Sequence, residues 1–350
     1  MNILIGMMER GVLPDAVIRL GIRLLHRRRL RQEDHGGVEA NREHQRRFFA
    51  ELAAGPLAVA TDAANRQHYE LPPEFFGEVL GPRRKYSCCL YPLRVRDLAT
   101  AEEVMLGQTC RRANLADGMD ILELGCGWGS LTLWMAEHYP GSRITAVSNS
   151  LPQRLYIEEC CKRLKLDNVR VITADMNHFA TDERFDRVVS VEMFEHMQDY
   201  PELMRRIHGW LKDSGRLFVH IFCHRRFTYP FETEGAGDWM ARHFFTGGVM
   251  PSEDLLLAGQ DALVAERRWA VSGLHYARTL REWRNAFHAN LEQVLTMGFD
   301  ERFIRMWEYY LCYCEGGFAE RFTGVVQLLF SKPGYREEPL LPPLKRKEQP

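Results

Sequence analysis

The sequence is short of two features that point to common classes of partner, namely long hydrophobic runs and an excess of charge of one sign. No apolar run reaches the roughly 18 residues that a membrane-spanning helix needs, so no membrane-spanning helix is expected. The 350 residues contain 46 Lys and Arg and 47 Asp and Glu, which gives a formal net charge of −1 at pH 7. Without an overall basic field, nucleic-acid binding is not expected. The N-terminus also lacks a signal-peptide core followed by a cleavage site, so we expect a cytoplasmic protein.

Cysteine occurs nine times, but not at spacings typical of metal sites. The pairs Cys88-Cys89, Cys160-Cys161 and Cys312/Cys314 include no C-x-x-C unit with a partner unit at zinc-finger spacing, so no metal site is predicted. Adjacent cysteines rarely bridge each other, and we expect reduced thiols. The apolar content of 45% and the charged content of 27% are typical of a globular chain.

What the sequence does contain is a glycine-rich turn in residues 119–129, Met-Asp-Ile-Leu-Glu-Leu-Gly-Cys-Gly-Trp-Gly. The apolar run up to Glu123 predicts a buried parallel strand. A tight turn into a helix near Ser130 should follow, because three alternate positions are glycine: Gly125, Gly127 and Gly129. Glycines let the backbone pass close under a ligand, and the first turn of a helix supplies unpaired N–H donors. The pattern is typical of a nucleotide-binding turn.

The spacing around this turn indicates which nucleotide it suits. A dinucleotide fingerprint is G-x-G-x-x-G, with an acid at the end of the next strand. Here the spacing is G-x-G-x-G, Glu123 precedes the first glycine, and the next predicted strand ends in the uncharged Ser148-Asn149-Ser150. An acid before the turn can bind the amino group of a methionine-type ligand, which favours S-adenosylmethionine (SAM). The alternative is a glycine-rich corner without a ligand.

From residue 119 onward, strand and helix patterns alternate, which predicts repeated βα units. Expected strands are Asp120–Leu124, Arg143–Val147, Val169–Thr173, Arg187–Val191 and Gly215–Ile221, and expected helices are Leu131–Tyr139, Pro152–Leu164 and Tyr200–Leu211. Such units build a parallel sheet with helices on both faces, and ligands lie at the carboxyl ends of its strands. Five stretches should therefore converge on one crevice: Gly125–Gly129, Ser148–Gln153, Asp175–Asn177, Glu192–His196 and His220–His224.

The first 70 residues precede this pattern and are expected to form a helical extension. Residues 13–32 predict a basic amphipathic helix that begins at Pro14-Asp15, with arginines on most sides and four apolar residues on one face: Val17, Leu20, Leu24 and Leu25. We favour a packing arm with solvated arginines, and the alternative is a helix that lies on an anionic membrane surface. A second helix is predicted from Glu39 to Ala53.

Between Phe222 and Thr279 the alternation stops, which predicts a lid of about residues 222–279 inserted into a domain that spans 71–332. Its aromatic residues suit a cage for a cation or a wall for an acyl chain: Phe227, Tyr229, Trp239 and Phe245. Helices Leu280–Met297 and Glu301–Glu315 and a last strand, Val325–Ser331, are expected to follow. The Pro- and Lys-rich tail, 333–350, is expected to be flexible.

Several motifs give a specific family resemblance: Tyr86-Ser87-Cys88, Leu124–Gly129, Glu192-Met193-Phe194-Glu195-His196-Met197 and Phe218-Val219-His220. On these, the stretch from about Leu71 to Lys332 resembles the cyclopropane-fatty-acid-synthase family of SAM-dependent methyltransferases. Within that family, four stretches look most like the coclaurine-type N-methyltransferases and their bacterial relatives: Lys85–Leu90, Phe218–His224, Asp238-Trp239-Met240 and Phe244–Pro251. The resemblance implies a class I SAM-methyltransferase fold, an α/β Rossmann-like sheet with helices on both faces.

By position, the resemblance implies SAM contacts from the following residues: Tyr86, Ser87, Glu123, Gly125, Gly127, Gly129, Ser148, Asn149, Gln153, Asp175 and Met176. In the fatty-acid cyclising branch, a bicarbonate base is held by the positions that match Cys88, Glu195, His220 and Tyr276. In the N-methyltransferase branch, three residues surround the acceptor amine: Glu192, Glu195 and His196. Phe222 stands where the cyclising branch usually has isoleucine, which weakens the case for bicarbonate.

These positions suit either of two reactions. Methyl transfer from a sulfonium is an in-line displacement, so the enzyme mainly positions donor and acceptor. A protonated amine must first lose a proton, for which Glu195 and His196 can supply a general base, while Glu192 orients the histidine or pairs with the cation. The alternative for this cluster is a helix-start acid with a capping histidine.

Our first hypothesis is N-methylation of a small amine, with S-adenosylhomocysteine as the second product. The runner-up is methylene or methyl transfer to an unsaturated acyl chain of a phospholipid, with bicarbonate as base and the N-terminal helix docked at the bilayer. A SAM-binding protein without activity ranks last, because the candidate base and the donor loop are both present. A homodimer is a further expectation that the sequence does not test.

Overall fold

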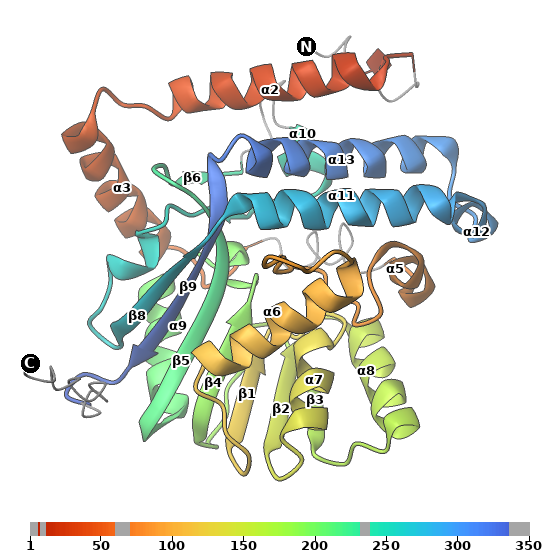
Figure 1. Cartoon of the computed structure of the whole chain (residues 1–350). Coiled ribbons are helices and arrows are strands. Elements are labelled where there is room, and N and C mark those ends of the chain that lie inside the picture. Colours follow the sequence, from red (N-terminus) through yellow and green to blue (C-terminus); the bar gives the residue numbers. More distant parts are fainter. Residues whose placement is uncertain (1–5, 8–11, 60–70, 232–238, 336–350) are drawn as a thin grey trace, which may run out of the picture.

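The computed structural model describes residues 6–7, 12–59, 71–231 and 239–335. Residues 60–70 of the predicted extension, 232–238 of the predicted lid and 336–350 of the predicted tail lie outside the described residues. The centre of the fold is a seven-stranded sheet with the order β3-β2-β1-β4-β5-β9-β8 (Figure 1). Its strands are β1 Asp120–Leu124, β2 Arg143–Ser148, β3 Val169–Thr173, β4 Phe185–Val191, β5 Leu211–His224, β8 Val264–Val271 and β9 Thr323–Ser331.

The five strands β1 to β5 are parallel to one another, as predicted. The last two strands are antiparallel: β9 pairs with β5, and β8 pairs with β9. Sequence analysis missed β8, which lies inside the range predicted as a lid. It is an edge strand whose central residues, Glu266, Arg267 and Arg268, are charged, and such a strand resembles a polar loop in sequence.

Helices cover both faces of the sheet. On one face lie α6 (Leu98–Arg112), α7 (Ser130–His138) and α8 (Leu151–Leu164), and on the other lie α9 (Tyr200–Trp210) and α3 (Val38–Ala53). The apolar side chains of each strand divide between the two layers: Ile121 packs with α6 and α7, whereas Leu122 and Leu124 pack with α9. This alternation follows from the period of two along a strand.

A second layer of helices crosses the carboxyl ends of the strands (Figure 1). It is built from α5 (Pro73–Val79), α10 (Trp239–His243), α11 (Gly273–Ala289), α12 (Leu291–Thr296) and α13 (Glu301–Ala319), together with the small sheet of β6 (Tyr229–Pro230) and β7 (Val249–Met250). The single helix predicted over Leu280–Met297 is wrong. α11 begins inside the predicted lid range, and Asn290 separates it from α12.

Helix α2 (Asp15–Gln32) runs alongside α13 at the outer edge of this layer (Figure 1). Its contact face is Ile22 and His26, which lie so close to Gly316 and Gly317 that a Cβ on those glycines would come within 2.9 Å and 3.1 Å of them. The predicted apolar face is instead turned outward, with Val17, Leu20 and Leu24 being 47%, 59% and 56% exposed. The helix packs on α13, but through a different face from the predicted one, and its contact with a membrane stays a prediction.

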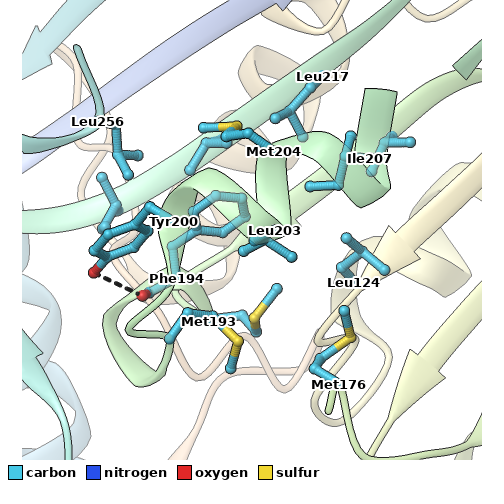
Figure 2. Packing of buried hydrophobic residues seen from close by; sticks show 14 of the residues in the cluster. Leu124, Met176, Met193, Phe194, Tyr200, Leu203, Met204, Ile207, Leu217 and Leu256 are labelled. Atoms are coloured by element: carbon cyan, nitrogen blue, oxygen red, sulfur yellow. Dashed lines mark hydrogen bonds between the residues drawn. The ribbon is translucent and has the colours of Figure 1, made fainter. Parts of the chain in front are cut away.

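A dense core holds the chain segment that follows β4 (Figure 2). This segment contains a short 3-10 helix, η2 (Phe194–His196), whose Phe194 is fully buried among Tyr200, Leu203 and Ile207 of α9. The Tyr200 hydroxyl donates a hydrogen bond of 3.1 Å to the Phe194 carbonyl. Packing and hydrogen bonding together fix the backbone next to the predicted catalytic residues.

All nine cysteines are free thiols, as predicted, and all but Cys314 are buried. Among the helices that the structure describes, none combines the length and the apolar character needed to cross a bilayer.

Candidate active site

A pocket lies at the carboxyl ends of β1, β2 and β4, where the sequence predicted a nucleotide. It is lined by nine of the residues predicted to contact SAM: Tyr86, Ser87, Glu123, Gly125, Gly127, Ser148, Asn149, Gln153 and Met176. Two predicted residues do not line it. Gly129 caps the start of α7, and the Asp175 carboxylate accepts a hydrogen bond from the N–H of Asn177.

The turn after β1 has the conformation that its glycines predict. Gly125, Gly127 and Gly129 all have positive φ, at 78°, 52° and 78°. A Cβ at Gly125 would lie 2.6 Å from Cβ of Met193, and one at Gly129 would lie 2.6 Å from Cγ1 of Ile157. A Cβ at Gly127 would have no atom of the described residues within 4 Å, although this residue lines the pocket. The turn therefore keeps side chains out of the space beneath a ligand.

Glu192 stands at the end of β4, where it accepts hydrogen bonds from three separate segments. Oε1 accepts from the backbone N–H of Cys88 at 3.0 Å and from Nε2 of His220 at 3.2 Å, and Oε2 accepts from the hydroxyl of Tyr276 at 2.6 Å. The backbone of Glu192 has φ of +51°, a conformation that non-glycine residues seldom adopt. Strain of this kind persists where the surroundings hold a residue in place, as these bonds do.

A buried relay determines the tautomer of His220. The guanidinium of Arg112 donates to Oε1 of Gln327, which orients the amide so that its Nε2 donates to Nδ1 of His220 at 2.8 Å. With Nδ1 occupied as an acceptor, Nε2 of His220 carries the proton that it donates to Glu192. Sequence analysis missed Arg112 and Gln327. The signal for Gln327 was a lone amide in the apolar strand 325–330, because a buried polar group needs a partner.

Of the three hydrogen-bonded groups Glu192, His220 and Tyr276, Glu192 carries the negative charge. Burial opposes ionisation of Glu192, but the hydrogen bond from His220, together with the charge of Lys85 and the hydrogen bond from Tyr276, outweighs it, so the pKa of Glu192 is below its usual value. Burial lowers the pKa of His220, which keeps its ring neutral at pH 7 despite the carboxylate. Burial, and then the charge of Glu192, holds the pKa of Tyr276 well above 10, so its hydroxyl remains a donor. Glu192 is therefore a largely buried carboxylate, with 9% of its side chain exposed, and both of its oxygens accept hydrogen bonds.

Glu195 and His196, the predicted general base, lie in different surroundings. Glu195 is fully buried, and its Oε1 accepts from the N–H of Phe222 at 2.7 Å. Burial and then the charge of Glu192 raise the pKa of Glu195 well above its usual value, which favours the neutral acid. His196 lines the pocket and stacks on Phe245, and burial lowers its pKa to about 4. Its ring is therefore neutral at pH 7, and the role of Glu195 stays a prediction.

A second, aromatic cavity is lined by Tyr276, whose hydroxyl bonds Glu192. It is lined mainly by rings and apolar side chains: Phe222, Tyr229, Phe231, Met240, Phe245, Met250, Tyr276, Leu280, Tyr310, Tyr313, Phe318 and Phe322. Three contacts join residues of the first pocket to residues of this cavity: Glu192 with Tyr276, Tyr86 with Tyr310, and His196 with Phe245. A methyl donor in the first pocket and a methyl acceptor in this cavity can therefore meet at the boundary between them.

The predicted aromatic lid contributes to this cavity only in part. Tyr229 and Phe245 line it, whereas Phe227 stacks on His224 and Trp239 is buried against Tyr309. Sequence analysis also missed that α2 reaches the cavity, through His26, Arg29 and Leu30.

Comparisons with known proteins agree with this geometry. A model of the family described as mycolic acid cyclopropane synthetase matches residues 59–328. The chain belongs to this family. Helices α2 and α3 precede the matched region.

Named relatives fall into two groups. The chain is 36% identical over 296 residues to an (S)-coclaurine N-methyltransferase of Thalictrum flavum subsp. glaucum, with 84% of this chain and 82% of that protein covered. It is 29% identical over 269 residues to the cyclopropane-fatty-acyl-phospholipid synthase of Escherichia coli K12, with 76% of this chain and 67% of that protein covered. A crystal structure of coclaurine N-methyltransferase bound to N-methylheliamine and SAH superposes with a TM-score of 0.89 at 33% identity, covering 94% of this chain and 99% of that one.

As a member of this family, the protein is a SAM-dependent methyltransferase, and SAM is its methyl donor. The residues that line the first pocket fit SAM. In the described part of the chain, buried Nε2 of Gln153 and Oγ of Ser130 have no hydrogen-bond partner, and Oγ of Ser148 bonds Oε1 of Gln153 at 2.6 Å. These atoms would hold the sugar and chain of SAM, and Glu123 its amino group. When bound, SAM supplies an electrophilic methyl group on a sulfonium.

Cofactor binding is expected to release a proton from Glu123. Burial raises the pKa of Glu123 to about 8, against a hydrogen bond from the Thr132 hydroxyl that lowers it. The carboxyl group is therefore largely protonated at pH 7 and must ionise to pair with an ammonium group. We expect SAM affinity to rise by up to about tenfold per pH unit between pH 6 and 8 and to level off above the pKa.

Calorimetric titration of SAM in buffers of different ionisation enthalpy measures this proton directly. Glu123→Gln should bind more weakly, with no proton release and a flat pH profile. Equal proton release in this variant would assign the proton to another group.

Proposed function

We propose that this enzyme transfers an intact methyl group from SAM to the nitrogen of a small aromatic amine. The observation that carries the proposal is the position of Glu192. Its carboxylate accepts hydrogen bonds from the N–H of Cys88, from His220 and from Tyr276. Three of the four groups expected to hold bicarbonate in the cyclising alternative thus already bind an anion that belongs to this chain.

A bicarbonate ion at these donors would lie against the Glu192 carboxylate. Two buried negative charges in contact repel strongly, because little water screens them. The fourth expected ligand, Glu195, accepts the N–H of Phe222 at Oε1, and its Oε2 has no hydrogen-bond partner among the described residues, so it is the charge of Glu192 that opposes bicarbonate. The site supports a reaction whose acceptor is cationic before it reacts rather than one that needs an added anionic base.

An amine acceptor would use the same groups directly. Glu192 supplies a negative charge for the incoming ammonium, and the aromatic walls, including Tyr276 and Phe245, favour a cation beside them. The neutral ring of His196 can accept the ammonium proton and so free the nitrogen lone pair. Similarity to the coclaurine N-methyltransferases, and the N-methylheliamine in the solved structure, support an aromatic amine.

The absence of a bicarbonate requirement is a test of this proposal. We expect the rate of methylation of a tetrahydroisoquinoline to be the same in bicarbonate-depleted buffer as in buffer with added bicarbonate. Mass spectrometry and NMR should place the new methyl group on nitrogen. A rate that falls on depletion and returns with bicarbonate would contradict the role assigned to Glu192.

A further inference from the structure

Two histidines line the part of the aromatic cavity that α2 covers. His26 comes from α2, and His224 is the last residue of β5. His224 is buried and His26 is partly buried. Neither belongs to the groups around Glu192, and the described part of the chain shows no acidic side chain lining this cavity.

Hydrogen bonds fix a different tautomer in each ring. Nε2 of His26 lies 3.2 Å from the carbonyl oxygen of Tyr313, and a carbonyl can only accept, so this nitrogen carries the proton. Nδ1 of His224 accepts the backbone N–H groups of Arg226 and Phe227 at 3.0 Å and 2.9 Å, so its proton is on Nε2. His26 is left with an acceptor, Nδ1, and His224 with a donor, Nε2–H. Among the described residues neither atom has a hydrogen-bond partner.

Strand β5 sets the distance between the His224 ring and the reaction centre. Alternate residues of β5 share one face, which places His220, Phe222 and His224 on the same side. His220 bonds Glu192, Phe222 lines the cavity wall, and His224 lies beyond both. Four residues of extended chain span about 13 Å, which exceeds the length of one aromatic ring and suits a fused bicyclic amine with a substituent.

We propose that His26 and His224 form a subsite that recognises a hydroxyl group at the end of the acceptor remote from its nitrogen. A hydroxyl both donates and accepts, so it can donate to Nδ1 of His26 and accept from Nε2–H of His224. An ether oxygen can use only the second contact, and an unsubstituted ring can use neither. The subsite rests on the proposed function, since it concerns the acceptor of that same reaction.

The surroundings keep both rings neutral and in place. Burial lowers the pKa of His224 to about 4 and also lowers the pKa of His26, so each retains one donor and one acceptor at pH 7. His224 stacks on Phe227 with ring centroids 5.0 Å apart. His26 packs on Gly317, where a Cβ would lie 3.1 Å from its Cε1. Of the two histidines, His26 lies on α2, before the region that the family model matches, and His224 lies inside that region.

The test compares three acceptors with the full-length enzyme and SAM: tetrahydroisoquinolines that carry hydrogen, methoxy or hydroxyl at the ring position remote from nitrogen. We expect kcat/KM to rise in that order, with the hydroxylated compound favoured over the unsubstituted one by about tenfold or more. The preference should appear mainly in KM.

Two substitutions separate the two contacts. In His224→Asn, the Asn oxygen can still accept the N–H groups of Arg226 and Phe227, as in an Asx turn, but Nε2–H is lost. The methoxylated acceptor should then fall to the level of the unsubstituted one, and the hydroxylated acceptor should keep only the part of its advantage that comes from Nδ1 of His26. In His26→Gln, the amide can still donate to the Tyr313 carbonyl, but Nδ1 is lost. This variant should methylate the hydroxylated and methoxylated acceptors equally well.

Arg27→Ala, an exposed position on α2, is the matched control and should keep the wild-type order. If all three acceptors slow alike in the histidine variants, or if wild-type enzyme methylates them equally well, the subsite is overturned while the proposed function stands. If wild-type enzyme methylates no amine at all, the proposed function itself fails.

Discussion

Glu192→Gln is expected to lower kcat/KM for an amine acceptor by about 10³-fold while leaving SAM affinity within about twofold of wild type. The substitution removes the negative charge that we propose pairs with the acceptor ammonium. It also places an amide N–H against donors, because Cys88, His220 and Tyr276 all donate to this side chain. A buried group that loses its partner costs far more than an exposed one.

Steady-state kinetics with a tetrahydroisoquinoline, and calorimetric binding of SAM, separate the two effects. Glu158→Gln is a suitable control, since Glu158 forms only a half-exposed ion pair with Arg154 on α8. An equal loss of SAM binding in Glu192→Gln would show that the carboxylate supports the cofactor pocket rather than the acceptor.

Gly125→Ala is expected to abolish SAM binding. Gly125 has φ of +78°, and a Cβ there would lie 2.6 Å from Cβ of Met193, on the well-packed segment after β4. The clash cannot be relieved by a side-chain tip, because the contact is with a Cβ held by the buried Phe194 beside it. The turn or the Glu192 segment must therefore move.

Gly118→Ala separates backbone strain from this clash. Gly118 also has positive φ, at 83°, but a Cβ there would meet no atom of the residues that the structure describes within 4 Å. We expect it to cost about 1–2 kcal/mol of folding free energy with no change in SAM affinity. Thermal melting and SAM titration of both variants make the comparison. Wild-type SAM affinity in Gly125→Ala would show that the cofactor does not depend on this turn.

The sequence predicted the cofactor half of the site well, because that half depends on local rules. The strand Asp120–Leu124 was predicted with its observed bounds, and Gly125 and Gly127 line the pocket as expected. Positive φ at glycine, and the convergence of parallel strand ends, follow from the chain's own pattern.

The acceptor half depends on contacts between distant segments, and these were predicted less well. The bonds from Gln327 to His220, and from Tyr276 to Glu192, join residues 107 and 84 positions apart. Nothing in the helical pattern of α2 showed that Gly316 and Gly317 would select Ile22 and His26 as its contact face. Hydrophobic periodicity favoured the face that is in fact exposed, and its contact with a membrane stays a prediction.

The central claim is that an intact methyl group goes to an amine nitrogen. The most direct measurement supplies SAM with a fully deuterated methyl group to one reaction that contains both a tetrahydroisoquinoline and vesicles of unsaturated phospholipid. We predict product amine that keeps all three deuterium atoms on its nitrogen methyl group, and no label in the extracted acyl chains. Acyl chains that carry a methylene with two deuterium atoms, beside an unlabelled amine, would contradict the claim and make the enzyme a lipid-cyclising one.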